Sequence, residues 1–93
     1  MLSLKTTAAG GRENMIKNGY RPDIKLKGQL IGVVFDELKT DLLPGQSGMA
    51  SMIFSTSAGK KMNVEKGLIF DIHEGKRIIG CGIISEISKE ENE

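Results

Sequence analysis

Three observations in the sequence predict an all-β domain, either a barrel or a sandwich. Short segments of alternating apolar and polar residues recur along the chain, and turn signals separate them at near-regular spacing. No segment offers ten residues of helical periodicity. The 93 residues suffice for one domain, which we expect to bury about 60 to 65% of its unfolded surface in a single small core.

Turn chemistry divides the first two thirds of the chain into the expected strands. The first strand is expected in MLSLKT, and a long loop follows it. Pro22 favours an extended conformation at the start of the next segment. Within this segment the apolar residues change from even to odd positions beyond Gly28, so a bulge, bend or turn is expected between Gly28 and Gly32. Pro44 and Gly45 fit the central pair of a type II turn. The strand GMASMIFS and the polar loop STSAGKK come next.

The clearest hairpin lies in GLIFDIHEGKRIIGCGIIS, residues 67–85. Glu74-Gly75 is the expected turn, because glycine tolerates the positive φ that tight hairpin loops require. Gly80 and Gly82 interrupt the returning strand, and glycine inside a strand marks a bend, a bulge or a close backbone approach, as in a strongly coiled barrel strand. Alternation with period two predicts that six side chains share one core face: Leu68, Phe70, Ile72, Ile79, Cys81 and Ile83.

Composition and charge exclude several classes of function. The 13 Lys and Arg residues nearly balance the 12 Asp and Glu residues, so the net charge of +1 gives no strong global field for nucleic acid or an anionic membrane. No stretch approaches the ~20 apolar residues of a membrane span, and no leader segment is evident, so we expect a cytoplasmic domain. We predict one domain over residues 1–87 and an acidic, disordered tail over residues 88–93.

No catalytic or metal-binding residue emerges from the sequence. The segment Ala58-Gly59-Lys60-Lys61 lacks both the earlier glycine and the following Ser or Thr of a phosphate-binding loop. His73 is the sole histidine and lies on the polar face of its strand, so we expect an exposed surface residue rather than a ligand or a base. Cys81 is the sole cysteine, and its apolar neighbours predict a small buried hydrophobe. We therefore expect neither an enzyme nor a cofactor.

Three segments in order resemble the C-terminal β-barrel, the third domain, of elongation factor Tu: GGRENMIKNGYRPDIKLK, LLPGQSG and GLIFDIHEGKRIIGCGIISEI. The family's Gly-Gly-Arg and, seven residues later, Tyr-Arg-Pro recur at residues 10–12 and 20–22, and the resemblance runs from Leu2 to Ile87. It implies a six-stranded antiparallel closed barrel. The family's closing pattern is present at Gly67, Leu68, His73, Glu74, Gly75, Arg77, Gly80 and Gly82.

The resemblance also implies partners. In elongation factor Tu this barrel helps to bind the T stem of aminoacyl-tRNA, contacts the nucleotide-exchange factor and packs against the other two domains. The implied RNA-contacting residues here are Arg12, Lys60 with Lys61 as its rival, and Gly75. The guanine-nucleotide domain and the second barrel have no counterpart in this sequence, so we expect neither nucleotide binding nor GTP hydrolysis.

Departures from the family lead to two hypotheses. Glu13 replaces a His, Asp23 a Gln and Ile31 a Thr, and the two new carboxylates repel phosphates. The first hypothesis is a protein-interaction module, which either mimics the factor's domain toward one of its protein partners or binds something unrelated through faces that the lost domains once covered. The alternative is a tRNA- or RNA-binding module. It would use Arg12, Lys60 and Lys61, together with Arg21, Lys25 and Lys27.

Overall fold

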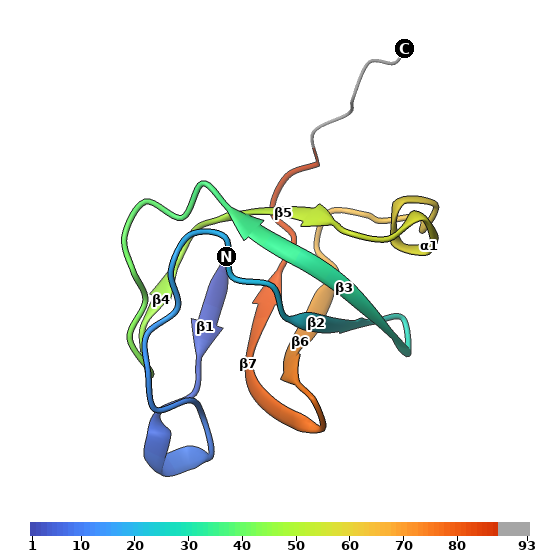
Figure 1. The fold of residues 1–93 in the computed structure, drawn as a ribbon. Coiled ribbons are helices and arrows are strands. Elements are labelled where there is room, and N and C mark those ends of the chain that lie inside the picture. Colours follow the sequence, from blue (N-terminus) through green and yellow to red (C-terminus); the bar gives the residue numbers. More distant parts are fainter. Residues whose placement is uncertain (88–93) are drawn as a thin grey trace.

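A computed structural model describes residues 1–87 and shows an all-β fold with two single helical turns (Figure 1). The turns are a 3-10 turn at Thr7–Ala9 and the α-helical turn α1 at Ser57–Lys60. The predicted acidic tail, residues 88–93, lies outside the described residues. The strands are β1 Leu2–Leu4, β2 Asp23–Leu26, β3 Gln29–Asp36, β4 Ser47–Gly48, β5 Ser51–Phe54, β6 Ile69–Glu74 and β7 Arg77–Ile83.

The strands form one curled antiparallel sheet in the order β4-β1-β7-β6-β2-β3-β5. Its two outermost strands belong to a single segment, in which only residues 49–50 separate β4 from β5. Because β4 pairs with β1 and β5 pairs with β3, this segment joins the two edges of the sheet. Counted as one bent strand, it gives six strands in a curled antiparallel sheet, a half-barrel consistent with the barrel that the resemblance implied, so the expected all-β fold class is confirmed.

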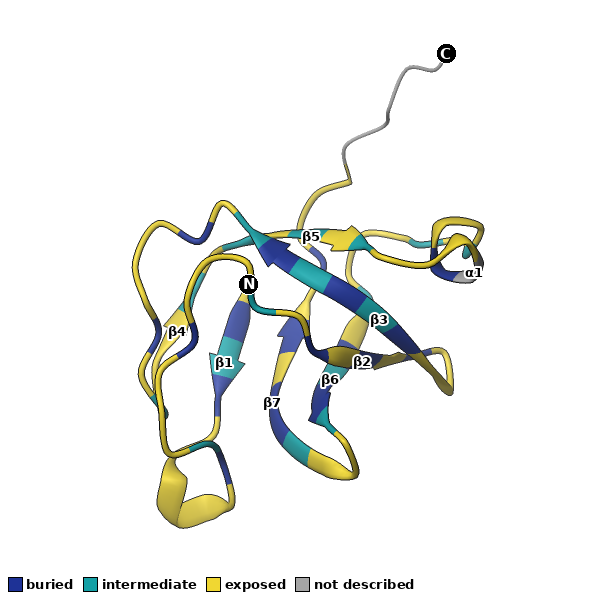
Figure 2. Cartoon of the chain, viewed as in Figure 1, coloured by how far each residue is buried: buried dark blue, intermediate teal, exposed yellow. Residues whose placement is uncertain are grey.

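The β2–β3 hairpin shows why the apolar phase changes near Gly28. Leu26 pairs with Gln29, so Lys27 and Gly28 form a two-residue loop, and both have positive φ, at 52° and 80°. That combination is the type I′ turn, whose twist matches the twist of hairpin strands. A turn was among the expected alternatives, although it begins one residue before the predicted interval. Buried positions then alternate along β3 (Figure 2).

The turn between β6 and β7 lies one residue later than the sequence predicted. Glu74 pairs with Arg77, so the central residues are Gly75 and Lys76 rather than Glu74 and Gly75. Gly75 has a φ of 60°, and glycine with positive φ at the first central position is typical of a type II′ turn.

A β-bulge changes the phase of β7. Ile72 pairs with Gly80, but His73 pairs with Ile78, which leaves Ile79 as an extra residue in the ladder. Side chains beyond the bulge therefore face opposite to the direction that strict alternation assigns.

Two of the predicted core positions are consequently wrong. Cys81 and Ile83 are exposed, and the positions that face the core beyond the bulge are Gly80 and Gly82. A Cβ atom on Gly82 would lie 2.4 Å from Cζ of Phe70, so the buried ring occupies the space that a side chain would need. The remaining predicted positions are confirmed as buried or half-buried: Leu68, Phe70, Ile72 and Ile79.

The prediction for His73 is also wrong. The residue is only 8% exposed, and neither ring nitrogen has a hydrogen-bond partner among the described residues. Alternation assigned His73 to a solvent face, but the ladder shifts by one residue between Ile72 and His73, and both are buried. A histidine beside a bulge is therefore enclosed without polar contacts.

Candidate functional site

Arg12, the leading RNA-contacting candidate, is bound within the fold. Its Nη1 atom lies 2.6 Å from Oε2 of Glu74, and its guanidinium carbon lies 4.8 Å from the centre of the Tyr20 ring. The Tyr20 hydroxyl donates a hydrogen bond to the same carboxylate oxygen. We call these three residues the Glu74 cluster. Only 20% of the Arg12 side chain is exposed, so the cluster ties the loop after Gly-Gly to the end of β6.

Local backbone geometry positions Arg12. Gly10 has a φ of 97°, in the left-handed region that glycine adopts without strain. A Cβ atom on Gly11 would lie 2.5 Å from the carbonyl oxygen of Lys5, so this position also requires glycine. The Thr7 hydroxyl then donates a hydrogen bond to the Arg12 carbonyl at 2.6 Å. The Gly-Gly-Arg motif therefore has a structural role in this chain.

Electrostatics inside the cluster keep it paired. Burial raises the pKa of Tyr20, and its hydrogen bond to Glu74 raises the pKa further. The phenol therefore remains a donor at neutral pH, while the Glu74 carboxylate accepts from both Tyr20 and Arg12. Arg77 lies 3.7 Å from the other carboxylate oxygen as a longer ion pair. The charge of Arg12 is thus neutralised locally by Glu74.

The structure brings only part of the implied RNA surface together. Gly75 is exposed and directly follows Glu74, so it lies beside Arg12. Lys60 and Lys61 are exposed at α1, and among the described strands α1 contacts only β3 and β5. Figure 1 shows α1 well apart from the β6–β7 turn. The two lysines therefore do not share a cluster with Arg12.

The three family departures occupy different environments. Glu13 is exposed and lines a shallow depression with Arg12 and Glu74. Asp23 is exposed at the start of β2, whereas Ile31 is 5% exposed and belongs to the core. Over residues 1–87, no three His, Cys, Asp or Glu side chains are close enough together to bind a metal ion. No helix in the same range has the length and apolar character needed to cross a membrane.

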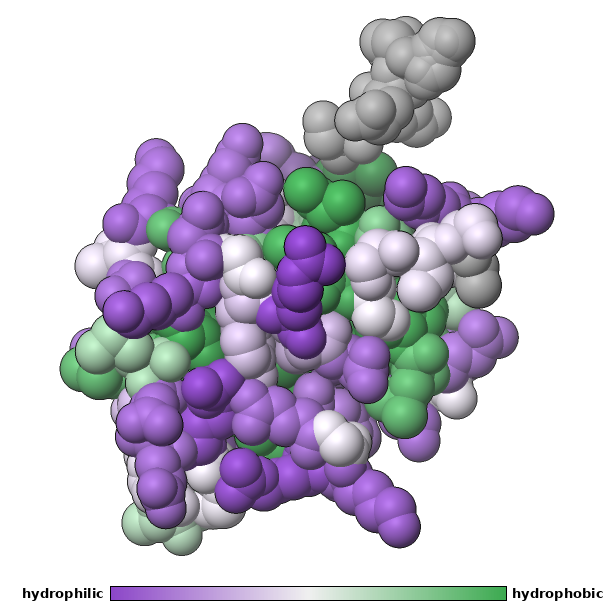
Figure 3. Space-filling model, viewed as in Figure 1, coloured by the Kyte–Doolittle hydropathy of each residue, from purple (hydrophilic) through white to green (hydrophobic). Residues whose placement is uncertain are grey.

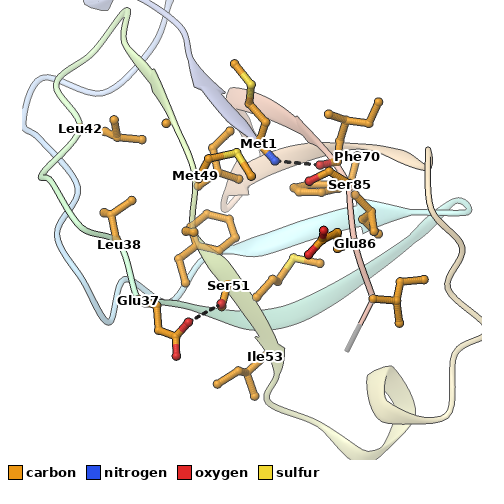
Figure 4. Close-up of a pocket in the computed structure, with 18 of the residues that line it drawn as sticks. Met1, Glu37, Leu38, Leu42, Met49, Ser51, Ile53, Phe70, Ser85 and Glu86 are labelled. Carbon is orange, nitrogen blue, oxygen red and sulfur yellow. Dashed lines mark hydrogen bonds between the residues drawn. The ribbon is translucent and has the colours of Figure 1, made fainter. Parts of the chain in front are cut away.

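A second site, which sequence reasoning missed, lies at the opposite end of the β6–β7 hairpin. It is a hollow of about 2180 Å³, and buried Phe35 and Phe70 are among the residues that line it (Figure 4). We call it the apolar hollow. Hydrophobic side chains gather at the surface where β7 ends (Figure 3). Five exposed hydrophobic residues line the apolar hollow: Met1, Met49, Ile53, Ile83 and Ile87.

Strand register joins three residues of this rim, Met1, Met49 and Ile83, into an apolar row that continues to Ile69 outside the apolar hollow. Ile69 pairs with Ile83, and the backbone of Ile83 exchanges two hydrogen bonds of 2.9 Å with Met1. Leu2 pairs with Gly48, so Met49 follows on the far side of Met1. An exposed apolar row therefore crosses β6, β7, β1 and the end of β4. The bulge explains why it was missed, because strict alternation placed Ile83 inside.

Comparison with protein families agrees with the fold and the motifs. The family model described as "Elongation factor Tu C-terminal domain" matches residues 3–88, which is nearly the whole chain. In elongation factor Tu this domain is a non-catalytic β-barrel that acts as a binding module. The chain therefore belongs to the elongation factor Tu C-terminal domain family.

Proposed function

We propose that this chain is a non-catalytic protein-interaction module and that the apolar hollow is its binding surface. The observation that carries the proposal is the exposed row formed by Ile69, Ile83, Met1 and Met49, which are 69%, 41%, 48% and 58% exposed, and of which all but Ile69 line the apolar hollow. Scattered surface hydrophobes are normal, but a contiguous apolar surface beside a hollow is typical of interaction sites. Family membership supports a connection with translation.

The size of the apolar hollow favours a macromolecular ligand. Small-molecule and cofactor sites have volumes of about 300 to 1,000 Å³ and enclose most of their ligand. The apolar hollow, at about 2180 Å³, is at least twice as large and is bordered by exposed side chains. A segment of another protein can cover such a surface, whereas a metabolite leaves most of it wet.

Charge placement argues against RNA as the ligand. Contacts to phosphate come mainly from Arg and Lys side chains, and each contact requires a cation that can leave its present partner. Arg12 is paired with Glu74, and Glu13 adds a carboxylate beside it. Lys60 and Lys61 lie elsewhere, at α1, so these two lysines do not extend a cationic surface from Arg12.

A matched pair of surface variants tests the proposal. Ile53 on β5 and Leu30 on β3 are both exposed, at 48% and 55%, but only Ile53 lines the apolar hollow. We expect affinity capture from cell extract to recover a protein that resists added salt and nuclease, and Ile53→Asp to abolish the recovery. Leu30→Asp should leave it unchanged. Submicromolar, salt-sensitive tRNA binding that Arg12→Ala abolishes would instead establish the RNA-binding alternative.

A further inference from the structure

We infer, on the basis of the proposed function, that the partner protein inserts an extended segment into the apolar hollow, where the segment pairs as a β-strand with the open edge of β5. The segment runs in line with β1 and closes the half-barrel. Three features support this inference: unpaired backbone groups on β5, a second open edge after β7, and the alternation of side chains along β5.

Strand β5 is paired along one edge only. It is the last strand of the sheet, and β3 is its single partner strand among residues 1–87. In antiparallel pairing, successive residues of a strand bond to its two neighbours in turn. The N–H groups of Val33 and Phe35 donate to residues just before β2, on the side of β3 away from β5. The even-numbered residues of β3 therefore face β5, and the carbonyl of Gly32 accepts from Ser55 at 3.0 Å.

The same alternation leaves two residues of β5 with open backbone groups. Ile53 pairs with Val34, an even-numbered residue, so its N–H and C=O bond to β3. The backbone groups of Met52 and Phe54 point the other way and have no hydrogen-bond partner within the described part of the chain. Both residues line the apolar hollow. An unpaired strand edge of this kind is what an extended peptide binds in β-strand addition.

A second open edge lies after β7. The backbone of Ile83 bonds to Met1, whereas that of Ile84 bonds to Leu68, on the side of β6. By alternation the backbone of Ser85 faces the side of Met1, beyond the start of β1, and it has no partner over residues 1–87. In Figure 4, Ser85 lies near Met1 and apart from the labelled residues of β5. A strand in line with β1 would bond to Ser85 along one edge and to β5 along the other.

The register of β1 fixes the direction and the pattern of the segment. β1 is antiparallel to β4, and only residues 49–50 separate β4 from β5, so a strand that continues the line of β1 is antiparallel to β5. Met52 and Phe54 pack against the core, whereas Ser51 and Ile53 are exposed. Because cross-strand neighbours share a face, the segment should have apolar residues at every second position.

Charge does not select the segment. Three carboxylates and three ammonium groups line the apolar hollow: those of Glu37, Asp41 and Glu86, and those of Lys39, Lys60 and the Met1 terminus. Backbone hydrogen bonds and apolar burial therefore supply the affinity, and binding should depend little on salt.

Other occupants leave backbone groups unpaired. A helix satisfies its hydrogen bonds internally, so it has none to offer Met52 or Phe54. The β5 strand of a second copy already has β3 along one edge, so it could pair with this β5 but not also with Ser85. Only an extended segment with two free edges fits between β5 and the end of β7.

Methylated peptides test the pairing on the intact chain. The probe is a capped seven-residue peptide of alternating Val and Thr. In β1 the inward-facing residues bond to the β4 side, as the N–H of buried Leu4 does to Gln46 at 2.9 Å. The Val residues should therefore bond to β5, and one N-methyl group on the central Val should weaken binding at least about tenfold. The same group on the first Thr is the control and should have little effect.

Hydrogen exchange identifies the groups that pair. In the free chain, the amides of Met52 and Phe54 should exchange faster than that of Ile53, which is bonded to β3. At about ten times the Kd of the peptide, exchange at Met52 and Phe54 should slow about tenfold. Equal protection of the three amides without peptide would show that the edge is already covered, and would contradict the inference.

A matched pair of variants at Met52 removes the pairing group itself. Met52→Pro and Met52→Ala both lose the methionine side chain, but only proline lacks the N–H that faces the open edge. Proline is tolerated at such edge positions because no ladder bond is lost. We expect Met52→Pro to bind the peptide at least about tenfold more weakly than Met52→Ala.

Failure of the inference is distinguishable from failure of the proposed function. Absence of binding by the unmethylated peptide, or equal binding of the two methylated peptides, overturns the strand pairing. If Ile53→Asp still abolishes partner capture in that case, the apolar hollow remains a protein-binding surface. Protection of Met52 and Phe54 that rises with chain concentration, without peptide, would identify a second copy as the occupant. If Ile53→Asp has no effect on capture either, the proposed function is wrong as well.

Discussion

The two ends of the β6–β7 hairpin differ in how far their side chains are engaged in contacts within the fold. At the turn, Glu74 pairs with Arg12 and Tyr20, and most of the Arg12 charge is enclosed. At the other end, Ile69 and Ile83 form an exposed cross-strand pair beside the apolar hollow. The turn end, which meets the Gly-Gly-Arg motif, is thus occupied by internal contacts, whereas the other end, beside the motif residues Gly67, Leu68 and Gly82, offers an exposed apolar surface.

This difference separates family membership from function. The motif residues Gly10, Gly11 and Arg12 preserve a loop geometry and an ion pair, so they are needed for the fold whether or not RNA is bound. The exposed row depends on strand register and on the bulge at Ile79, neither of which is a motif. A motif cation such as Arg12 is therefore weaker support for a binding site than an exposed apolar row that no other part of the fold covers.

The largest expected effect concerns the boundary between the core and the apolar hollow. Phe70 lines the apolar hollow yet is only 3% exposed, so Phe70→Ala should lower the free energy of unfolding by about 3 to 5 kcal/mol. Ile69, its neighbour on β6, is 69% exposed, and Ile69→Ala should change the stability by less than about 0.5 kcal/mol. Urea denaturation of both variants measures the contrast. Similar losses of stability in Phe70→Ala and Ile69→Ala would show that the exposed apolar row is also packed in solution.

The two inward-facing glycines of β7 give the next largest effect. A Cβ atom on Gly80 would lie 2.4 Å from the backbone oxygen of Ser3, while one on Gly82 would meet the Phe70 ring. The backbone of a paired strand can move aside less easily than the Phe70 ring, which borders a hollow. Gly80→Ala should therefore destabilise the fold more than Gly82→Ala. We expect each substitution to cost about 1 to 3 kcal/mol. Cys81→Ala, at the exposed position between them, is the control. Thermal unfolding of the three variants tests the bulge, and a neutral Gly80→Ala would contradict it.

The sequence predicted what depends on local pattern. Turn chemistry at Gly28 and at Pro44-Gly45 agrees with the structure, where Gly45 has a φ of 88° and Leu43 accepts a hydrogen bond from Gln46 at 3.0 Å. Alternation correctly assigned Phe70 and Ile72 to the core. Each of these features involves residues only a few positions apart, so a single sequence contains the information.

The sequence did not predict what depends on pairing between distant segments. One extra residue, Ile79, reversed the phase of β7 and so misplaced Cys81 and Ile83. Arg12 and Glu74 are 62 positions apart, and no spacing rule connects them. The apolar hollow requires residues from the first, middle and last parts of the chain together. The sequence contained one clue to the true phase of β7. Gly80 and Gly82 alternate with larger residues, which is the pattern of a strand whose glycines face a crowded core.

The Glu74 cluster gives a smaller effect that depends on pH. Burial and the hydrogen bond to Glu74 raise the pKa of Tyr20 above its ordinary value of 10.0, so the folded chain retains a proton that the unfolded chain loses. The free energy of unfolding should therefore fall as the pH rises above about 10. Tyr20→Phe should flatten this dependence and cost about 1 to 3 kcal/mol at neutral pH, because Glu74 loses a donor.

Phenolate absorbance measures this titration directly. Tyr20 is the only tyrosine of the chain, so no other residue contributes to the signal. We expect the phenol to ionise only as the chain unfolds at alkaline pH. Glu74→Gln, which removes the negative charge from the cluster, should move the ionisation to lower pH. Ionisation near pH 10 in the folded wild-type chain would show that the cluster is open in solution.

The smallest expected effect concerns His73, a buried polar residue that directly precedes Glu74 on β6 but belongs neither to the Glu74 cluster nor to the apolar hollow. Its two ring nitrogens have no hydrogen-bond partner among residues 1–87, and an unsatisfied buried polar group costs about 1 to 3 kcal/mol. His73→Leu removes that cost at similar volume, so we expect a change between neutral and about 1 kcal/mol of stabilisation. His73→Asn keeps a polar group and leaves a cavity, and it should destabilise the fold. If urea denaturation instead shows His73→Leu to be the worse variant, the imidazole makes hydrogen bonds in solution, for example to a buried water molecule.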